Sequence, residues 1–279
     1  MLSCGAVYAD ESNCRREGSG GAIHTVHSAV NISKSKFTSN KAGSHGGATY
    51  SVNSLININK SEFSSNKAYY AGGAVFVSEG SVNIYWSKFT DSNAGDRGGV
   101  ITATDSTIEI YWSKFFINGA GRDGGAIDIS CSRLTELATV NISGSVFYNN
   151  KADDGGVITA SKVTMTIDGS DFIENRASTG VLHISESSIL FSGKTTIENN
   201  TGSLLLFSSN LNTTQMGVIK VVNNSSPKNN TSHQQGGAVT SFLSKIFLYG
   251  TGILMHNEAE SGGAIFATAR ANGSFMVNY

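Results

Sequence analysis

Charged side chains precede three successive glycine pairs and are the residues of this sequence best placed for catalysis. These residues are Asp96-Arg97, Arg122-Asp123 and Asp153-Asp154. Clustered carboxylates can act as acid and base on a glycoside or can bind Ca²⁺ beside an arginine. Either chemistry requires the three segments to lie side by side. In that arrangement Asp96 lies over Arg122 and Arg122 over Asp153, so an exposed ion-pair ladder on a turn is the preferred interpretation.

Aromatic side chains are duplicated in two segments of the sequence. Residues 83–89 read Asn-Ile-Tyr-Trp-Ser-Lys-Phe, and residues 109–115 read Glu-Ile-Tyr-Trp-Ser-Lys-Phe. Other copies carry polar residues or glycine in place of the Tyr-Trp pair: Ser33-Lys34, Asn59-Lys60, Ser143-Gly144 and Asp168-Gly169. That polarity indicates a solvent-facing corner.

The four aromatic residues Tyr85, Trp86, Tyr111 and Trp112 therefore predict an exposed apolar patch, flanked by lysines, that receives a sugar ring or a protein partner. The alternative is that ring stacking merely stiffens two neighbouring copies. We call these four residues the aromatic ridge.

A recurring glycine pair positions both sets of residues. Five pairs follow one another at steps of 26 residues: Gly20-Gly21, Gly46-Gly47, Gly72-Gly73, Gly98-Gly99 and Gly124-Gly125. The later copies are Gly155-Gly156, the degenerate Thr179-Gly180 and Thr201-Gly202, and then Gly236-Gly237 and Gly262-Gly263. Self-similarity at this period predicts a solenoid of stacked units.

Each unit contains three short apolar runs separated by polar turns, as in residues 74–77, 81–84 and 87–89. Strand-length runs without a helical stripe predict an all-β fold, a parallel β-helix with three strands per coil and about ten coils of about 26 residues. The rule for parallel crossovers makes it right-handed. A leucine-rich repeat has a similar period, but the first five copies hold little leucine beyond Leu55 and Leu134.

Phenylalanine followed three residues later by asparagine closes most units. The phenylalanines are expected to stack in the core. The asparagines fall on a turn, where they tolerate left-handed geometry and form a structural ladder along the stack. The ladder residues are Asn40, Asn66, Asn118, Asn150 and Asn175, whereas Phe89 is followed by Asn93, one residue later.

Residues 20–279 are thus expected to form one β-helix domain, with enlarged turns near 131–138 and 225–235 and with residues 1–19 as an irregular or truncated first coil. The sequence ends within a coil, at Phe275-Met276-Val277-Asn278-Tyr279. Neither end shows a signal peptide, anchor or capping unit, so we expect a piece of a longer protein whose uncapped ends allow self-association.

Composition excludes several classes of function. A net charge of −1 with scattered Lys and Arg gives no footprint for nucleic acid. No apolar run approaches the roughly 20 residues of a transmembrane helix. The absence of His-x-x-x-His or Cys-x-x-Cys spacing predicts no metal site, and no cofactor is expected. Either Cys4 and Cys14 form a disulfide, which leaves Cys131 over, or all three cysteines remain thiols.

Ten Asn-x-Ser/Thr sequons favour a secreted, glycosylated chain. They begin at Asn31, Asn59, Asn141, Asn199, Asn212, Asn223, Asn224, Asn229, Asn230 and Asn272.

The repeat of Gly-Gly-Ala-Ile/Val in phase with Phe-x-x-Asn, over residues 20–279, resembles that of the chlamydial polymorphic outer-membrane proteins, whose passenger regions are considered right-handed β-helices of the pectin-lyase-like class. The resemblance implies display at the cell surface and adhesion, and it transfers no catalytic residue. We therefore expect a non-catalytic, extracellular or cell-surface module that binds a glycan or protein. The alternatives are a polysaccharide lyase or glycoside hydrolase of the β-helix class and a pure scaffold.

Overall fold

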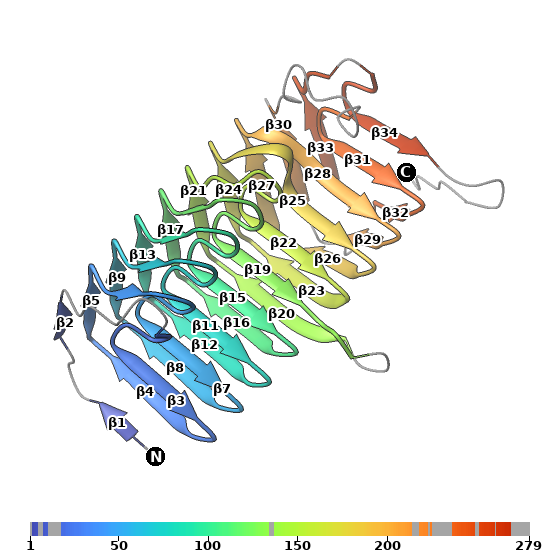
Figure 1. Ribbon diagram of the computed structural model, residues 1–279. Coiled ribbons are helices and arrows are strands. Elements are labelled where there is room, and N and C mark those ends of the chain that lie inside the picture. The colour runs from blue at the N-terminus through green and yellow to red at the C-terminus, as the bar shows by residue number, and fades with distance from the viewer. Residues whose placement is uncertain are drawn as a thin grey trace.

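The computed structural model describes residues 2–4, 8–10, 18–133, 137–213, 218–222, 224, 236–248, 251–259 and 261–268. They form strands and turns, without a helix, and the strands belong to three ten-stranded parallel sheets and one four-stranded sheet. Each turn of the chain adds one strand to each long sheet, and successive turns lie side by side from the N-terminal to the C-terminal end (Figure 1). The predicted all-β parallel β-helix with a 26-residue step is confirmed.

Sheet 1 follows the glycine pairs. It contains β3 (Ile23–Val26), β7 (Thr49–Val52), β11 (Val75–Ser78), β15 (Ile101–Thr104), β19 (Ile127–Ser130), β22 (Ile158–Ser161), β25 (Arg176–Ser185), β28 (Thr201–Phe207), β31 (Val239–Phe242) and β34 (Ile265–Thr268). Sheet 2 contains β1 (Leu2–Cys4), β4 (Ala29–Ser33), β8 (Leu55–Asn59), β12 (Ser81–Tyr85), β16 (Thr107–Tyr111), β20 (Ala138–Ser143), β23 (Val163–Asp168), β26 (Ser188–Ser192), β29 (Asn210–Thr213) and β32 (Lys245–Phe247).

Sheet 3 completes each turn. It contains β2 (Tyr8–Asp10), β5 (Lys36–Thr38), β9 (Glu62–Ser64), β13 (Lys88–Thr90), β17 (Lys114–Phe116), β21 (Val146–Tyr148), β24 (Asp171–Ile173), β27 (Lys194–Glu198), β30 (Val218–Val222) and β33 (Thr251–Met255). Among the described residues, nine turns contribute a strand to all three long sheets, from β3 to β33, slightly fewer than the ten coils predicted; β1 and β2 belong to a partial turn before them and β34 to a partial turn after them.

A fourth sheet, which the sequence pattern does not predict, lies between sheets 3 and 1. Its two-residue strands are β6 (Lys41–Ala42), β10 (Lys67–Ala68), β14 (Asn93–Ala94) and β18 (Gly119–Ala120). Of the two enlarged turns, the first separates β19 from β20 and contains Cys131, which is a buried thiol. The second, residues 225–235, lies outside the described residues, as does Cys14.

The core consists of side chains stacked one turn above another. Five ring contacts join consecutive phenylalanines at centroid distances of 4.6–5.0 Å: Phe37–Phe63, Phe63–Phe89, Phe89–Phe115, Phe115–Phe147 and Phe147–Phe172. All six rings are fully buried, beside columns of Val and Ile from sheets 1 and 2. Near-parallel, offset rings add to the free energy gained from burying their area.

The glycine pair serves two purposes. The first glycine takes a left-handed conformation, with φ of 65° at Gly46. The second lets neighbouring turns approach, because a Cβ added at Gly47 would lie 2.0 Å from the carbonyl oxygen of Gly73. A side chain at either place would therefore force the turns apart or strain the backbone.

The asparagine side chains form a buried hydrogen-bonded ladder after sheet 3. Asn118 Nδ2 donates to Asn150 Oδ1 at 3.0 Å and to the carbonyl oxygen of Phe89 at 3.2 Å. The Oδ1 atom of Asn150 also accepts from the backbone N–H of Asn118. The same pattern joins Asn40 to Asn66 and then runs through Asn150, Asn175, Asn200, Asn224 and Asn257.

Two details of the ladder differ from the sequence-based expectation. The left-handed residue is the one before each asparagine, for example Ser39 with φ of 54°, so the asparagine serves as a hydrogen-bonding group. The ladder position between Asn66 and Asn118 is Ser92, whose backbone N–H donates to Asn118 Oδ1, while Asn93 belongs to β14. The buried Ser92 hydroxyl oxygen has no hydrogen-bond partner in the structure.

Completing the ladder should stabilise the chain. In Ser92→Asn, the new Oδ1 would accept from Asn66 and the new Nδ2 would donate to Asn118 Oδ1 and to the carbonyl of Phe63, as its neighbours do. Each net hydrogen bond contributes about 1 kcal/mol, and burial of the amide offsets part of the gain from the three new bonds, so we expect the free energy of unfolding to rise by about 1–3 kcal/mol. Chemical denaturation measures it. Ser92→Ala is the control, and a Ser92→Asn chain no more stable than this control would contradict the prediction.

Candidate functional site

The charged turns before the glycine pairs form a closed ion-pair network. Arg97 Nε lies 3.4 Å from Asp96 Oδ2 and 3.4 Å from Asp123 Oδ2. Arg122 Nε lies 3.4 Å from Asp96 Oδ1 and 2.9 Å from Asp123 Oδ2. Both carboxylates are thus shared by the same two guanidinium groups, an arrangement that neutralises the acids rather than preparing one of them for proton transfer.

The two aspartates one turn further on are not part of this network. Asp154 Oδ1 accepts a hydrogen bond from Thr179 Oγ1 at 2.6 Å, and Asp123 pairs with Asp154 along the stack. No ion pair joins Arg122 to Asp153 in the described part of the chain. Among the same residues, no group of three or more His, Cys, Asp or Glu side chains is arranged to hold a metal ion.

One buried acid beside the network escaped the sequence analysis. Asp128 is 5% exposed on sheet 1, paired with Thr102 one turn before and Thr159 one turn after. The two threonine hydroxyls donate to the carbonyls of Arg97 and Asp154, five residues earlier in each turn. Burial, together with the charge of Asp123, raises the pKa of Asp128 to about 7, although Arg97 acts in the opposite direction.

The aromatic ridge lies at the corner between sheets 2 and 3. Tyr85 stacks on Tyr111 at 5.3 Å with an interplanar angle of 7°, and Trp86 stacks on Trp112 at 4.9 Å and 12°. The two indoles are 53% and 51% exposed. Tyr85 Oη donates to Glu109 Oε2 at 3.4 Å, and burial followed by the charge of Glu109 raises the pKa of Tyr85. The stacked pairs thus form one exposed apolar surface.

The faces of the two indoles are covered within the column. Lys60 Nζ lies 5.7 Å from the centroid of the Trp86 ring, on the side of the preceding turn. On the following turn stands Gly144, where an added Cβ would lie 2.7 Å from Trp112 Cδ1. The ridge therefore presents ring edges to solvent, between an ammonium group at one end and a glycine at the other.

The backbone at this corner does not require tryptophan. The corresponding φ angles are 48° at Lys34, 49° at Lys60, 47° at Trp86, 48° at Trp112 and 56° at Gly144. One left-handed conformation is thus occupied by lysine, tryptophan and glycine in consecutive turns. Bulky residues are uncommon in this region, where glycine has no steric penalty.

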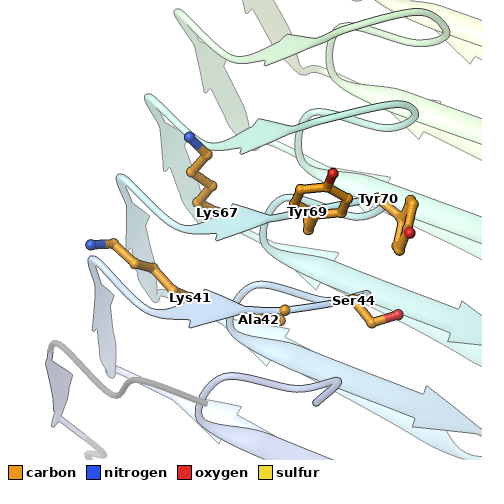
Figure 2. Close-up of a pocket in the computed structure, with 7 residues that line it drawn as sticks. Lys41, Ala42, Ser44, Lys67, Tyr69 and Tyr70 are labelled. Carbon is orange, nitrogen blue, oxygen red and sulfur yellow. The ribbon is translucent and has the colours of Figure 1, made fainter. Parts of the chain in front are cut away.

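A second aromatic group, also missed from the sequence, lies on the connection from sheet 3 to sheet 1. Tyr69 and Tyr70 are 66% and 51% exposed, and their rings meet edge to face at 4.7 Å. They line a hollow of about 770 Å³ with Lys41, Ala42, Gly43, Ser44 and Lys67. Figure 2 shows Lys41, Ala42 and Ser44 along one turn and Lys67, Tyr69 and Tyr70 along the next. The sequence carries one signal for this group, because Tyr69 stands where the neighbouring copies have Gly43 and Gly95.

Comparisons with protein-family models, with curated proteins and with solved structures find no match to this chain. The residues that the structure describes include no helix long and apolar enough to cross a membrane. The geometry of the surface is therefore the basis for a functional assignment.

Because the pKa of the Asp128 carboxyl is raised in the folded chain, we expect the free energy of unfolding to fall as pH rises. The unfolded chain loses this proton near the ordinary pKa of 3.8, whereas the folded chain holds it to about 7, so folding loses stability between these values. Asp128→Asn removes the titrating group and keeps a side chain of nearly the same size. At pH 8 we expect the free energy of unfolding of the variant to exceed that of the parent by about 2–4 kcal/mol. At pH 4 the two values should be close.

Thermal unfolding at several pH values checks this prediction, with Glu79→Gln, a change at an exposed corner, as control. An Asp128→Asn advantage that is independent of pH would show that the carboxyl is ionised throughout.

Proposed function

We propose that this chain is a non-catalytic binding module of a secreted or cell-surface protein and that the aromatic ridge is its contact surface. The observation that carries the proposal is the pair of half-exposed indoles, Trp86 and Trp112, at a corner where the fold accepts lysine or glycine equally well. Stacking gives such a pair about 0.5–1.5 kcal/mol. Neither core packing nor turn geometry accounts for their exposed area.

The chemistry of the ridge favours a protein partner over a glycan. A sugar ring stacks on the flat face of an aromatic side chain, but Lys60, Trp112 and Gly144 cover the indole faces. The exposed edges, with the phenol rings and lysines around them, have the composition of a hot spot in a protein–protein interface.

The sequence likeness to the chlamydial polymorphic outer-membrane proteins supports an adhesin-like role and display outside the cell. The ion pairs of Asp96 and Asp123 support a module without catalysis, because both carboxylates are neutralised by arginine. Along the described turns the rod holds the ridge rigidly, which lowers the entropic cost of binding.

Replacing both indoles by the residues of neighbouring turns tests the proposal. Trp86→Lys with Trp112→Gly should reduce binding of the labelled chain to cultured cells by at least about tenfold, because apolar contact is lost. The melting temperature should change by no more than about 3 °C. Flow cytometry and thermal unfolding give the two readings, and prior digestion of the cells with protease should abolish binding by the parent chain.

Ile117→Asn is the matched control, since Ile117 is another exposed apolar residue at a left-handed corner, with Asn149 one turn later. This variant should bind as the parent does. Full binding by the double tryptophan variant would contradict the proposal, as would a large loss of stability, which would make the stack structural. Binding that resists protease and is removed by glycosidases would contradict a protein partner.

A further inference from the structure

The Tyr69 ring lies between two turns that carry no side chain at the same place. Lys67 and Ala68 pair with Lys41 and Ala42 in the preceding turn and with Asn93 and Ala94 in the following turn. In this register Tyr69 is flanked by Gly43 and Gly95. Its ring is therefore not stacked between side chains of these two turns, although the Tyr70 ring meets it edge to face at 4.7 Å, and Tyr69 is the most exposed of the large apolar side chains in the described residues.

Two lysines stand at one end of this hollow. Lys41 and Lys67 are register partners in β6 and β10, both are exposed, and neither forms an ion pair within the described part of the chain. The lining of the hollow contains no carboxylate. The neighbouring hollow along the same edge, by contrast, combines Lys67 and Lys151 with Asp91 and Asp153. Of these two hollows, the one beside Tyr69 has lysines and no carboxylate in its lining.

The hollow also contains hydrogen-bonding groups, and the ring of Tyr70 is held by a neighbouring histidine. Tyr70 stacks against His45 at 5.8 Å, and burial lowers the pKa of His45, which favours its neutral form. Ser44 Oγ lies 2.6 Å from His45 Nδ1. The two phenol groups and the Ser44 hydroxyl can exchange hydrogen bonds with the hydroxyls of a ligand.

We infer that this hollow binds one unit of an acidic glycan, a sugar carrying a carboxylate or sulfate group. The C–H groups on one face of a pyranose match the negative face of the Tyr69 ring. The ammonium groups of Lys41 and Lys67 match the anionic substituent, as charge-assisted contacts. A neutral sugar would leave the two adjacent lysines without a counter-charge. The inference goes beyond the proposed function, because the hollow lies at a different edge of the rod from the aromatic ridge.

Calorimetry on the full chain tests this with three probes of matched length: an oligogalacturonate, a sulfated oligosaccharide and a neutral oligosaccharide. We expect binding of one or both acidic probes and none of the neutral probe. Tyr69→Ala should weaken binding by at least about tenfold, and Tyr69→Phe should keep most of it. Lys41→Ala with Lys67→Ala should weaken binding by a similar factor and flatten its dependence on salt.

Lys88→Ala with Lys114→Ala is the matched control, because these are also exposed lysines paired across one turn, but on sheet 3 and outside the hollow. Equal loss in this control, or an unchanged affinity in Tyr69→Ala, would show general attraction of a polyanion and overturn the inference. Equal binding of the neutral probe, or no binding of either acidic probe, would overturn it as well. The Trp86→Lys, Trp112→Gly chain should bind the acidic probes normally, which separates this site from the ridge.

Discussion

Parallel hydrogen bonding between one turn and the next is the constraint on which the rest of this structure depends. Each strand finds its partners one turn away, so the register of one sheet fixes the register of the other two. The close approach at Gly47 and the amide ladder through Asn118 and Asn150 admit a single alignment of the turns. A slip by one residue would place the core phenylalanines outside and break the ladder.

The same constraint turns sequence position into a surface position. Residues one repeat apart become neighbours, so the doubled Tyr-Trp segment becomes a stack of two tyrosines beside a stack of two tryptophans. Tyr69 has glycines as its neighbours one turn away and contacts only the edge-to-face ring of Tyr70 among the aromatic side chains that the structure describes, whereas Trp86 and Trp112 stack on each other between Lys60 and Gly144. The two aromatic surfaces therefore present different groups to solvent, because different residues stand one turn before and after them.

Much of this could be predicted from the sequence, because the period itself encodes the register. The strands, the buried phenylalanines and the adjacency of Trp86 and Trp112 follow from a 26-residue step. The burial of Asp128 does not, since it depends on how a turn folds over the outer face of sheet 1. Neither does the pairing of β6 with β10, whose two-residue strands are too short to give a periodic pattern. The hollow at Tyr69 depends on the glycines that flank this residue one turn before and after, and the register of β6, β10 and β14 is what identifies them as Gly43 and Gly95.

The most direct test of the account is cross-linking between turns. In a chain with Cys4→Ser and Cys14→Ser, cysteines placed at the exposed register partners Lys88 and Lys114 should form a disulfide on mild oxidation. Cysteines at Lys88 and Phe116, offset by two residues, should remain thiols, because their Cα atoms would lie beyond disulfide reach. Mass spectrometry of the digested chains decides between these results. Equal cross-linking of both pairs, or a preference for the offset pair, would contradict the register and with it both binding surfaces.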